Sequence, residues 1–192
     1  VSALSTSPTI PNNIEYLVVA GGGGGGGGQS GGGGAGGFRT SLPEGPGGPS
    51  PTAESQITIS GPFPSPYSIT VGAGGVGVKD VQGGSGTPST FSTITSQGGG
   101  GGGSLSPGVG KNGGSGGGAG HDPARTPGTG GTGNRVTDTS TPAPNQGYSG
   151  GSVGSYGSPF FGAGGGGAGA AGGDGAPSSW GIGGDGKRTS IA

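Results

Sequence analysis

Uninterrupted glycine, as in the eight residues from Gly21 to Gly28, constrains this chain more than any other sequence feature. Glycine loses the most backbone freedom on folding and has no side chain to bury. The chain contains 61 glycines among 192 residues but only 27 Leu, Ile, Val and Phe residues. That is too few for the apolar core of a helical bundle, a doubly wound α/β fold or a conventional sandwich. The glycine runs lie at Gly21 to Gly37, Gly72 to Gly77, Gly98 to Gly103, Gly113 to Gly120, Gly128 to Gly133, Gly162 to Gly175 and Gly183 to Gly186.

Composition excludes several other classes of protein. Seven basic and eight acidic residues give a net charge of −1, which offers no basic surface for nucleic acid or anionic lipid. With no cysteine the chain has no disulfide framework. The longest fully apolar stretch, Leu17 to Ala20, is too short to insert into a membrane. The chain begins at Val1 and lacks methionine, so we expect a processed chain or a segment of a longer one.

Short strand-like segments adjoin the glycine runs, which argues against general disorder. They alternate apolar and polar residues or form short apolar stretches, as half-buried strands do. Between two of them, Gly61 to Pro66 is rich in proline and predicts a turn. Low apolar content still leaves substantial disorder as an alternative. The segments are Ile14 to Ala20, Gln56 to Ser60, Tyr67 to Val71 and Phe91 to Thr95.

The glycine runs themselves predict an extended threefold helix of the polyproline II type. Such a helix has no internal hydrogen bonds and directs its backbone groups outward, so neighbouring runs can pair with one another. We therefore expect a mostly irregular, all-β fold without α-helix: a layered sandwich of polyglycine II helices with a few short β-strands. Larger residues inside the runs, namely Val76, Thr129, Thr132 and Asp174, are expected at the surface or rim.

Several motifs in this order resemble the glycine-rich domains of bacteriophage tail-fibre and related virion appendage proteins. The resemblance covers about residues 14 to 186. It is carried by Tyr16-Leu17-Val18-Val19-Ala20-Gly21, Gly37-Phe38-Arg39-Thr40, Tyr67-Ser68-Ile69-Thr70-Val71-Gly72, Ser89-Thr90-Phe91-Ser92-Thr93-Ile94 and Phe160-Phe161-Gly162-Ala163.

This resemblance implies a polyglycine II sandwich whose loops touch a receptor on the host surface. It predicts an extracellular, non-enzymatic virion protein that is oligomeric or attached to a larger fibre and binds a surface protein or glycan. A self-assembling filament subunit, held by interchain backbone hydrogen bonds and an N-terminal strand, is the alternative. An elastic or disordered glycine-rich protein is a third. We expect residues 1–13 to form an extended segment or linker and residues 14–192 a single domain, with loops at about 39–55 and 121–161.

Aromatic and arginine residues in or near these loops are the candidate contacts, because such residues dominate binding hot spots. Tyr148 and Tyr156 have a second interpretation, in which they cap the ends of the layers together with Phe161. Trp180 also has a second interpretation, which the sequence favours: together with Ile182 it covers an edge of the layers. The candidate contact residues are Arg39, Arg125, Arg135, Tyr148, Tyr156, Phe160 and Trp180.

Catalysis and cofactor binding find no support in the sequence. His121 beside Asp122 lacks a placed nucleophile and is predicted to lie in a surface turn. Asp174-Gly175 and Asp185-Gly186 are typical turn dipeptides, so no metal site is expected. Gly108 to Lys111 lacks the strand and helix that a phosphate-binding loop requires. We therefore expect no catalytic residue, metal or cofactor.

Overall fold

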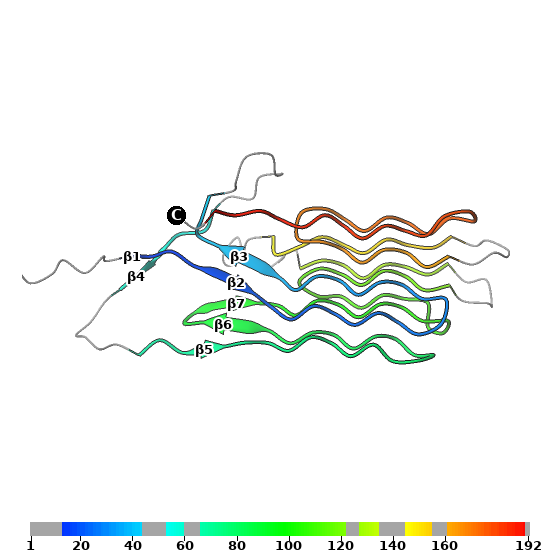
Figure 1. Ribbon diagram of the computed structural model, residues 1–192, viewed down its shortest axis with the longest axis horizontal. Coiled ribbons are helices and arrows are strands. Elements are labelled where there is room, and N and C mark those ends of the chain that lie inside the picture. The colour runs from blue at the N-terminus through cyan, green and yellow to red at the C-terminus, as the bar shows by residue number, and fades with distance from the viewer. Residues whose placement is uncertain are drawn as a thin grey trace, which may run out of the picture.

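The computed structural model describes residues 13–43, 53–59, 66–121, 127–134, 145–154 and 161–190. These residues contain seven short strands and no helix, which confirms a mostly irregular, β-type fold. The strands gather near one end of an elongated molecule, and the glycine runs extend side by side from them (Figure 1). The strands are β1 (Asn13–Ile14), β2 (Leu17–Val19), β3 (Phe38–Thr40), β4 (Ile57–Thr58), β5 (Ile69–Thr70), β6 (Ser89–Phe91) and β7 (Ile94–Ser96).

All strand pairs are antiparallel. β1 pairs with β4, β2 pairs with β3, and β5, β6 and β7 form a three-stranded sheet in that order. Four predicted strand segments thus contain strands, although each strand is only two or three residues long. Phe38–Thr40 was not expected to be a strand, because its pairing partner β2 lies across the whole first glycine run.

The single strand predicted from Phe91 to Thr95 is wrong, since the chain reverses there. Phe91 pairs with Ile94 across a tight hairpin. Ser92 adopts a positive φ of 53°, a left-handed conformation that allows the two-residue turn. The apolar residues on either side of the turn therefore face each other on adjacent strands, where the sequence suggested successive positions on one strand.

Backbone hydrogen bonds join the glycine runs in steps of three residues. The amide nitrogens of Gly21, Gly24 and Gly27 donate to the carbonyl oxygens of Thr87, Gly84 and Val81 at 3.2, 2.9 and 3.0 Å. A second set of donors in the same run, Ala20, Gly23 and Gly26, bonds to Gly37, Gly34 and Gly31. Every third residue of this run therefore bonds to one neighbouring run, and the residues that precede them bond to another. A period of three residues is the repeat of an extended threefold helix. The layered sandwich of such helices stays a prediction.

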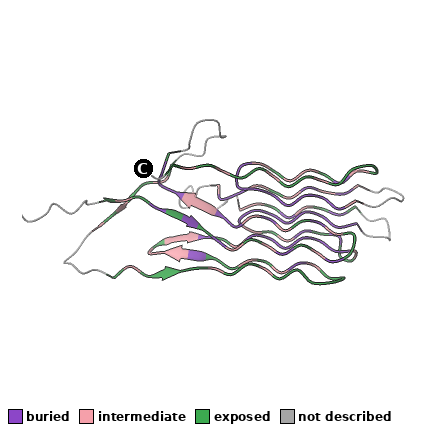
Figure 2. Cartoon of the chain, viewed as in Figure 1, coloured by how far each residue is buried: buried purple, intermediate pink, exposed green. Residues whose placement is uncertain are grey.

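Backbone, small side chains and a few larger residues fill the interior. Ala119, Val153 and Ala163 form a buried apolar cluster, with 0, 4 and 2% of their surfaces exposed. The inner runs are mostly buried, whereas the run that follows β5 along one edge is mostly exposed (Figure 2). Val76, Thr129, Thr132 and Asp174 are exposed as predicted, so the larger residues within the runs lie on the surface.

Glycine is required at many run positions because a neighbouring backbone occupies the space of a side chain. A Cβ on Gly23 would lie 2.1 Å from the carbonyl oxygen of Gly100, and one on Gly24 would lie 2.4 Å from that of Val76. Gly25 is exposed, and its Cβ would meet no atom nearer than the Gly31 oxygen at 4.0 Å. The steric requirement for glycine therefore repeats with the three-residue period of the run.

Two predicted loops are partly incorrect. Arg39, the expected start of the first loop, lies in β3, because residues 38–40 pair with β2. Within the second loop, residues 128–133 and 146–153 join the hydrogen-bonded runs, as the bonds from Gly113 to Thr132 and from Ala119 to Gly151 illustrate. The remainder, at 44–52, 122–126, 135–144 and 155–160, lies outside the described residues, as does most of the proline turn before Pro66.

A polar cluster of Tyr16, Arg39 and Glu54 connects the strands through side-chain hydrogen bonds. The Tyr16 hydroxyl donates to Glu54 Oε2 at 2.8 Å, and Arg39 donates to both oxygens of the same carboxylate. A further Arg39 nitrogen donates to the Thr95 carbonyl at 3.2 Å, which connects β3 to β7. Burial raises the pKa of the Tyr16 phenol above its ordinary value, and the hydrogen bond to Glu54 raises it further. The cluster thus favours the neutral phenol.

Gly23→Ala and Gly25→Ala form a matched pair within one run. Gly23→Ala forces two backbones apart and is expected to lower the free energy of unfolding by about 1–3 kcal/mol or more. Gly25→Ala is expected to leave it unchanged or to raise it by up to about 1 kcal/mol, because alanine restricts the unfolded chain. Denaturant unfolding of both variants measures the difference. Equal effects at the two positions would contradict the close packing of the runs.

Tyr16→Phe is expected to lower the free energy of unfolding at pH 7 by about 1.5 kcal/mol through the lost hydrogen bond. In the native protein, the stabilising contribution of the Tyr16 phenol is complete below the unfolded tyrosine pKa near 10 and is lost as pH rises further. The variant should therefore lose less stability between pH 9 and 12, as measured by urea unfolding. Tyr67→Phe is the control, because its hydroxyl makes no hydrogen bond within the described part of the chain. Identical alkaline profiles for wild type and Tyr16→Phe would refute this role.

Candidate interaction surface

An aromatic pair lies at the end of the runs that is remote from the strands. The Phe161 and Trp180 rings meet edge to face, with centroids 5.2 Å apart and an interplanar angle of 89°. A turn through Pro177 brings Trp180 there, since Ala176 and Ser179 exchange two backbone hydrogen bonds of 3.1 Å across it. Trp180 remains 59% exposed. The indole is therefore oriented by Phe161 and still accessible.

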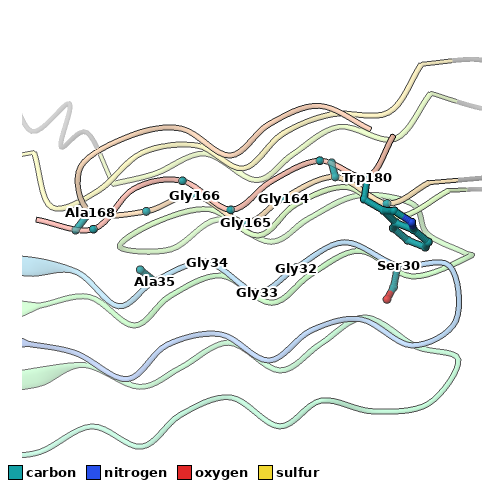
Figure 3. A pocket seen from close by; sticks show the side chains of 17 residues that line it. Ser30, Gly32, Gly33, Gly34, Ala35, Gly164, Gly165, Gly166, Ala168 and Trp180 are labelled. Carbon is teal, nitrogen blue, oxygen red and sulfur yellow. The ribbon is translucent and has the colours of Figure 1, made fainter. Parts of the chain in front are cut away.

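Trp180 stands at one end of an open groove of about 530 Å³, which we call the Trp180 groove. Its lining comes from three runs and from Trp180 itself. The runs contribute Ser30 and residues 32–35, residues 162–168, and the glycines at 181, 183, 184 and 186. Trp180 and Ser30 lie near the same end, and Ala168 marks the other (Figure 3). Three chain segments that are distant in the sequence thus build one surface.

The Trp180 groove presents bare backbone beside an aromatic ring. A Cβ on Gly183 or Gly186 would meet no atom within 4 Å, so a ligand can approach the backbone there. The Ser30 hydroxyl donates to the Gly26 carbonyl at 2.6 Å and helps to hold the turn at residues 27–30. No lining residue carries a charge or a basic group next to a nucleophile. The arrangement suits non-covalent contact through shape, aromatic area and backbone hydrogen bonds.

Of the three predicted contact residues that the structure describes, Trp180 alone lines this groove. Arg39 lies among the strands, where the ion pair with Glu54 at 2.5 Å leaves 16% of its side chain exposed. Tyr148 lies within a run, with its amide nitrogen donating to Gly167 and its carbonyl accepting from Gly116. Trp180 and Ile182 are 59 and 78% exposed, so they cover the edge only in part. The candidates Arg125, Arg135, Tyr156 and Phe160 lie outside the described residues.

The prediction that His121 occupies a surface turn is wrong. Only 3% of its surface is exposed, and its amide nitrogen donates to the Gln29 carbonyl at 3.0 Å. The residue ends an inner run and is packed between neighbouring chain segments, which the adjacent Asp-Pro sequence did not indicate. Among the described residues, no group of three or more His, Cys, Asp or Glu side chains could hold a metal ion. No described helix is long and apolar enough to cross a membrane.

Sequence reasoning missed some structural partners. No sequence motif identifies Glu54 as the hydrogen-bond acceptor of Tyr16 and Arg39. That role depends on the packing of residues 53–59 beside β3. The run at residues 146–153 holds few glycines, but Gly147 and Gly150 are three residues apart and each faces a neighbouring backbone. A search for glycine at a spacing of three would have found this run, whereas a search for uninterrupted glycine does not.

Comparison with known proteins identifies a glycine-rich family and gives no related structure. Neither a search of curated proteins nor one of solved structures finds a match. A family model described as a glycine-rich domain matches residues 2–192, which is nearly the whole chain. The chain therefore belongs to the glycine-rich domain family.

Proposed function

We propose that this chain is a non-enzymatic, extracellular scaffold that presents loops and the Trp180 groove to a receptor, as a phage tail-fibre domain does. The observation that carries the proposal is the network of backbone hydrogen bonds with a three-residue step. Runs that are hydrogen-bonded in this way fix the positions of the segments that connect them, and they place few constraints on the residues in those segments. Recognition by a protein of this kind needs contact area and hydrogen bonds and no chemical step.

In this proposal the runs are polyglycine II helices stacked in layers. The hydrogen bonds between neighbouring runs are consistent with three rows, two of which contain five runs each and the third two runs. Most inner glycines face another backbone on the side where a Cβ would stand, which suits helices in close contact. The first row comprises residues 71–78, 20–27, 31–37, 162–168 and 181–187; the second 81–87, 98–104, 114–120, 147–153 and 170–175; the third 108–113 and 128–133.

The receptor-facing end in this proposal is the one that carries Trp180. His121 and Phe161, which bound the predicted second loop, both lie there, because His121 bonds to Gln29 in the turn beside Ser30 and Phe161 contacts Trp180. An exposed, oriented tryptophan at the same end as these two residues is a suitable centre for a binding hot spot. The partner would be a host surface protein or a glycan, and the chain would be part of a virion appendage.

A filament subunit is the second candidate, and the outermost run favours it. Val71, Val76 and Val78 on that run are 84, 70 and 45% exposed. Exposed apolar side chains along one edge would be covered if copies stacked laterally. Negative-stain microscopy of the purified chain separates the two candidates, because long helical polymers support a filament, whereas separate particles that bind cells support a scaffold for recognition.

Hydrogen exchange tests the proposed layers. Amide protons at residues 99–103 and 114–120, which lie in inner runs, should exchange at least about 1,000-fold more slowly than those of a free peptide. Amides of the exposed outer run at 73–78 should exchange considerably faster. The measurement is hydrogen–deuterium exchange followed by mass spectrometry or NMR. Exchange of the inner runs at free-peptide rates would eliminate the layered architecture.

Trp180→Ala tests the receptor role of the groove. We expect it to weaken binding of the labelled chain to receptor-bearing cells by about 30-fold or more, as loss of a hot-spot aromatic does. Ile182→Ala is the matched control, since Ile182 is 78% exposed and does not line the groove. Cell binding is measured by flow cytometry over a concentration series, and thermal unfolding checks that both variants fold. Unchanged binding of Trp180→Ala would remove the groove from the proposal.

A further inference from the structure

A second hollow, of about 470 Å³, lies on a different set of runs from the Trp180 groove and shares no lining residue with it. We call it the amide hollow. Its side chains come from four separate segments, near residues 85–88, 97–98, 112–113 and 132–134. We propose that the amide hollow binds a neutral saccharide. This inference does not depend on the proposed receptor function or on the predicted loops.

The chemistry of the lining is uncharged and rich in groups that both donate and accept hydrogen bonds. Gln97, Asn112 and Asn134 contribute carboxamides, and Ser85 and Thr132 contribute hydroxyls. Each carboxamide offers two N–H donors and one carbonyl acceptor, and each hydroxyl offers both functions. Sugar hydroxyls need the same combination, whereas an anionic ligand would require a cation that this lining lacks. The lining therefore favours a neutral polyhydroxylated ligand.

Most of these polar groups are available. The side chains of Ser85, Gln97 and Asn134 make no hydrogen bond within the part of the chain that the structure describes. Asn112 uses its carbonyl oxygen to accept the Thr132 amide at 2.8 Å, which leaves its NH₂ group for a ligand. A concave surface that keeps several polar side chains without partners is suited to exchanging bound water for the hydroxyls of a ligand.

The backbone beneath the amide hollow is fixed. Gly86 donates to Gly99 at 2.9 Å, and Gly114 donates to Gly98 at 2.7 Å. Gly113 donates to Thr132 at 3.2 Å, which joins the two runs that carry Asn112 and Thr132. Ligand binding would therefore order only side chains, and this limits its entropic cost.

An extended peptide is the competing ligand, since its backbone also donates and accepts. Peptide recognition ordinarily adds apolar pockets for side chains to the backbone hydrogen bonds. Pro88 is the one lining residue with a wholly apolar side chain, so the amide hollow offers no such pocket. A lining that combines one proline with several amides and hydroxyls is better matched to the C–H groups and hydroxyls of a pyranose ring.

The test is an NMR titration of the full chain with maltohexaose, mannohexaose, chitohexaose, hexagalacturonate and hexaglycine. We expect at least one neutral hexasaccharide to shift the side-chain amide signals of Gln97, Asn112 and Asn134 in a saturable way. The double variant Gln97→Ala/Asn134→Ala should lose about tenfold or more in affinity, because it removes two ligand hydrogen bonds without breaking one inside the protein. Gln29→Ala is the matched control, an exposed carboxamide outside the hollow, and should bind as wild type does.

Several outcomes would overturn the proposal. Absence of saturable shifts with all three neutral saccharides at 10 mM would refute it. So would hexagalacturonate or hexaglycine binding at these amides more tightly than any neutral saccharide. Retention of full affinity by a correctly folded double variant, as judged by its backbone spectrum, would place the saccharide elsewhere. Because Trp180 lies outside the amide hollow, Trp180→Ala should leave this binding intact, and that keeps the outcome separate from the receptor test.

Discussion

The close approach of one peptide backbone to another is the interaction on which this structure depends. A Cβ on Gly23 would lie only 2.1 Å from the carbonyl oxygen of Gly100 in a neighbouring run. Only a residue without a side chain permits that contact, and the contact in turn allows amide and carbonyl groups to pair between runs. Hydrogen bonds and dispersion between backbones thereby replace much of the apolar core that the composition cannot supply.

This arrangement sets a strict rule for side chains. Along a run, the position that faces solvent accepts a larger residue, as Val76, Thr129 and Thr132 do, while most inner positions hold glycine, alanine or serine and Val153 is a buried exception. Alanine and serine also enter the interior, since Ala119 and Ser115 are fully buried. The sequence of a run is therefore less repetitive than its backbone, and Gly147 and Gly150 maintain a run in which glycine is a minority.

Much of the backbone plan could be predicted from the sequence, and contacts between distant segments could not. Alternating apolar and polar residues identified the positions of β4 and β5, a short apolar stretch before glycine identified β2, and glycine content identified most of the runs. The hairpin at Ser92 depends on a positive φ that nothing in the local sequence requires. The burial of His121 depends on the turn at Gln29, which lies far away in the sequence. Arg39 was interpreted as an exposed contact because its partner Glu54 is brought beside it only by the fold.

The difference between inner and outward positions of a run determines where binding sites can form on this structure. A substitution at an inner glycine displaces a neighbouring backbone and is transmitted to every run bonded to it, so the inner runs have little freedom to change. The turn that carries Trp180 and the outward positions that carry Asn112 and Thr132 impose no such constraint on their neighbours. A chain held together by backbone pairing can therefore vary its surface chemistry widely without altering its interior. This separation of support from recognition is the physical reason to seek binding sites at the ends and outer faces of the runs.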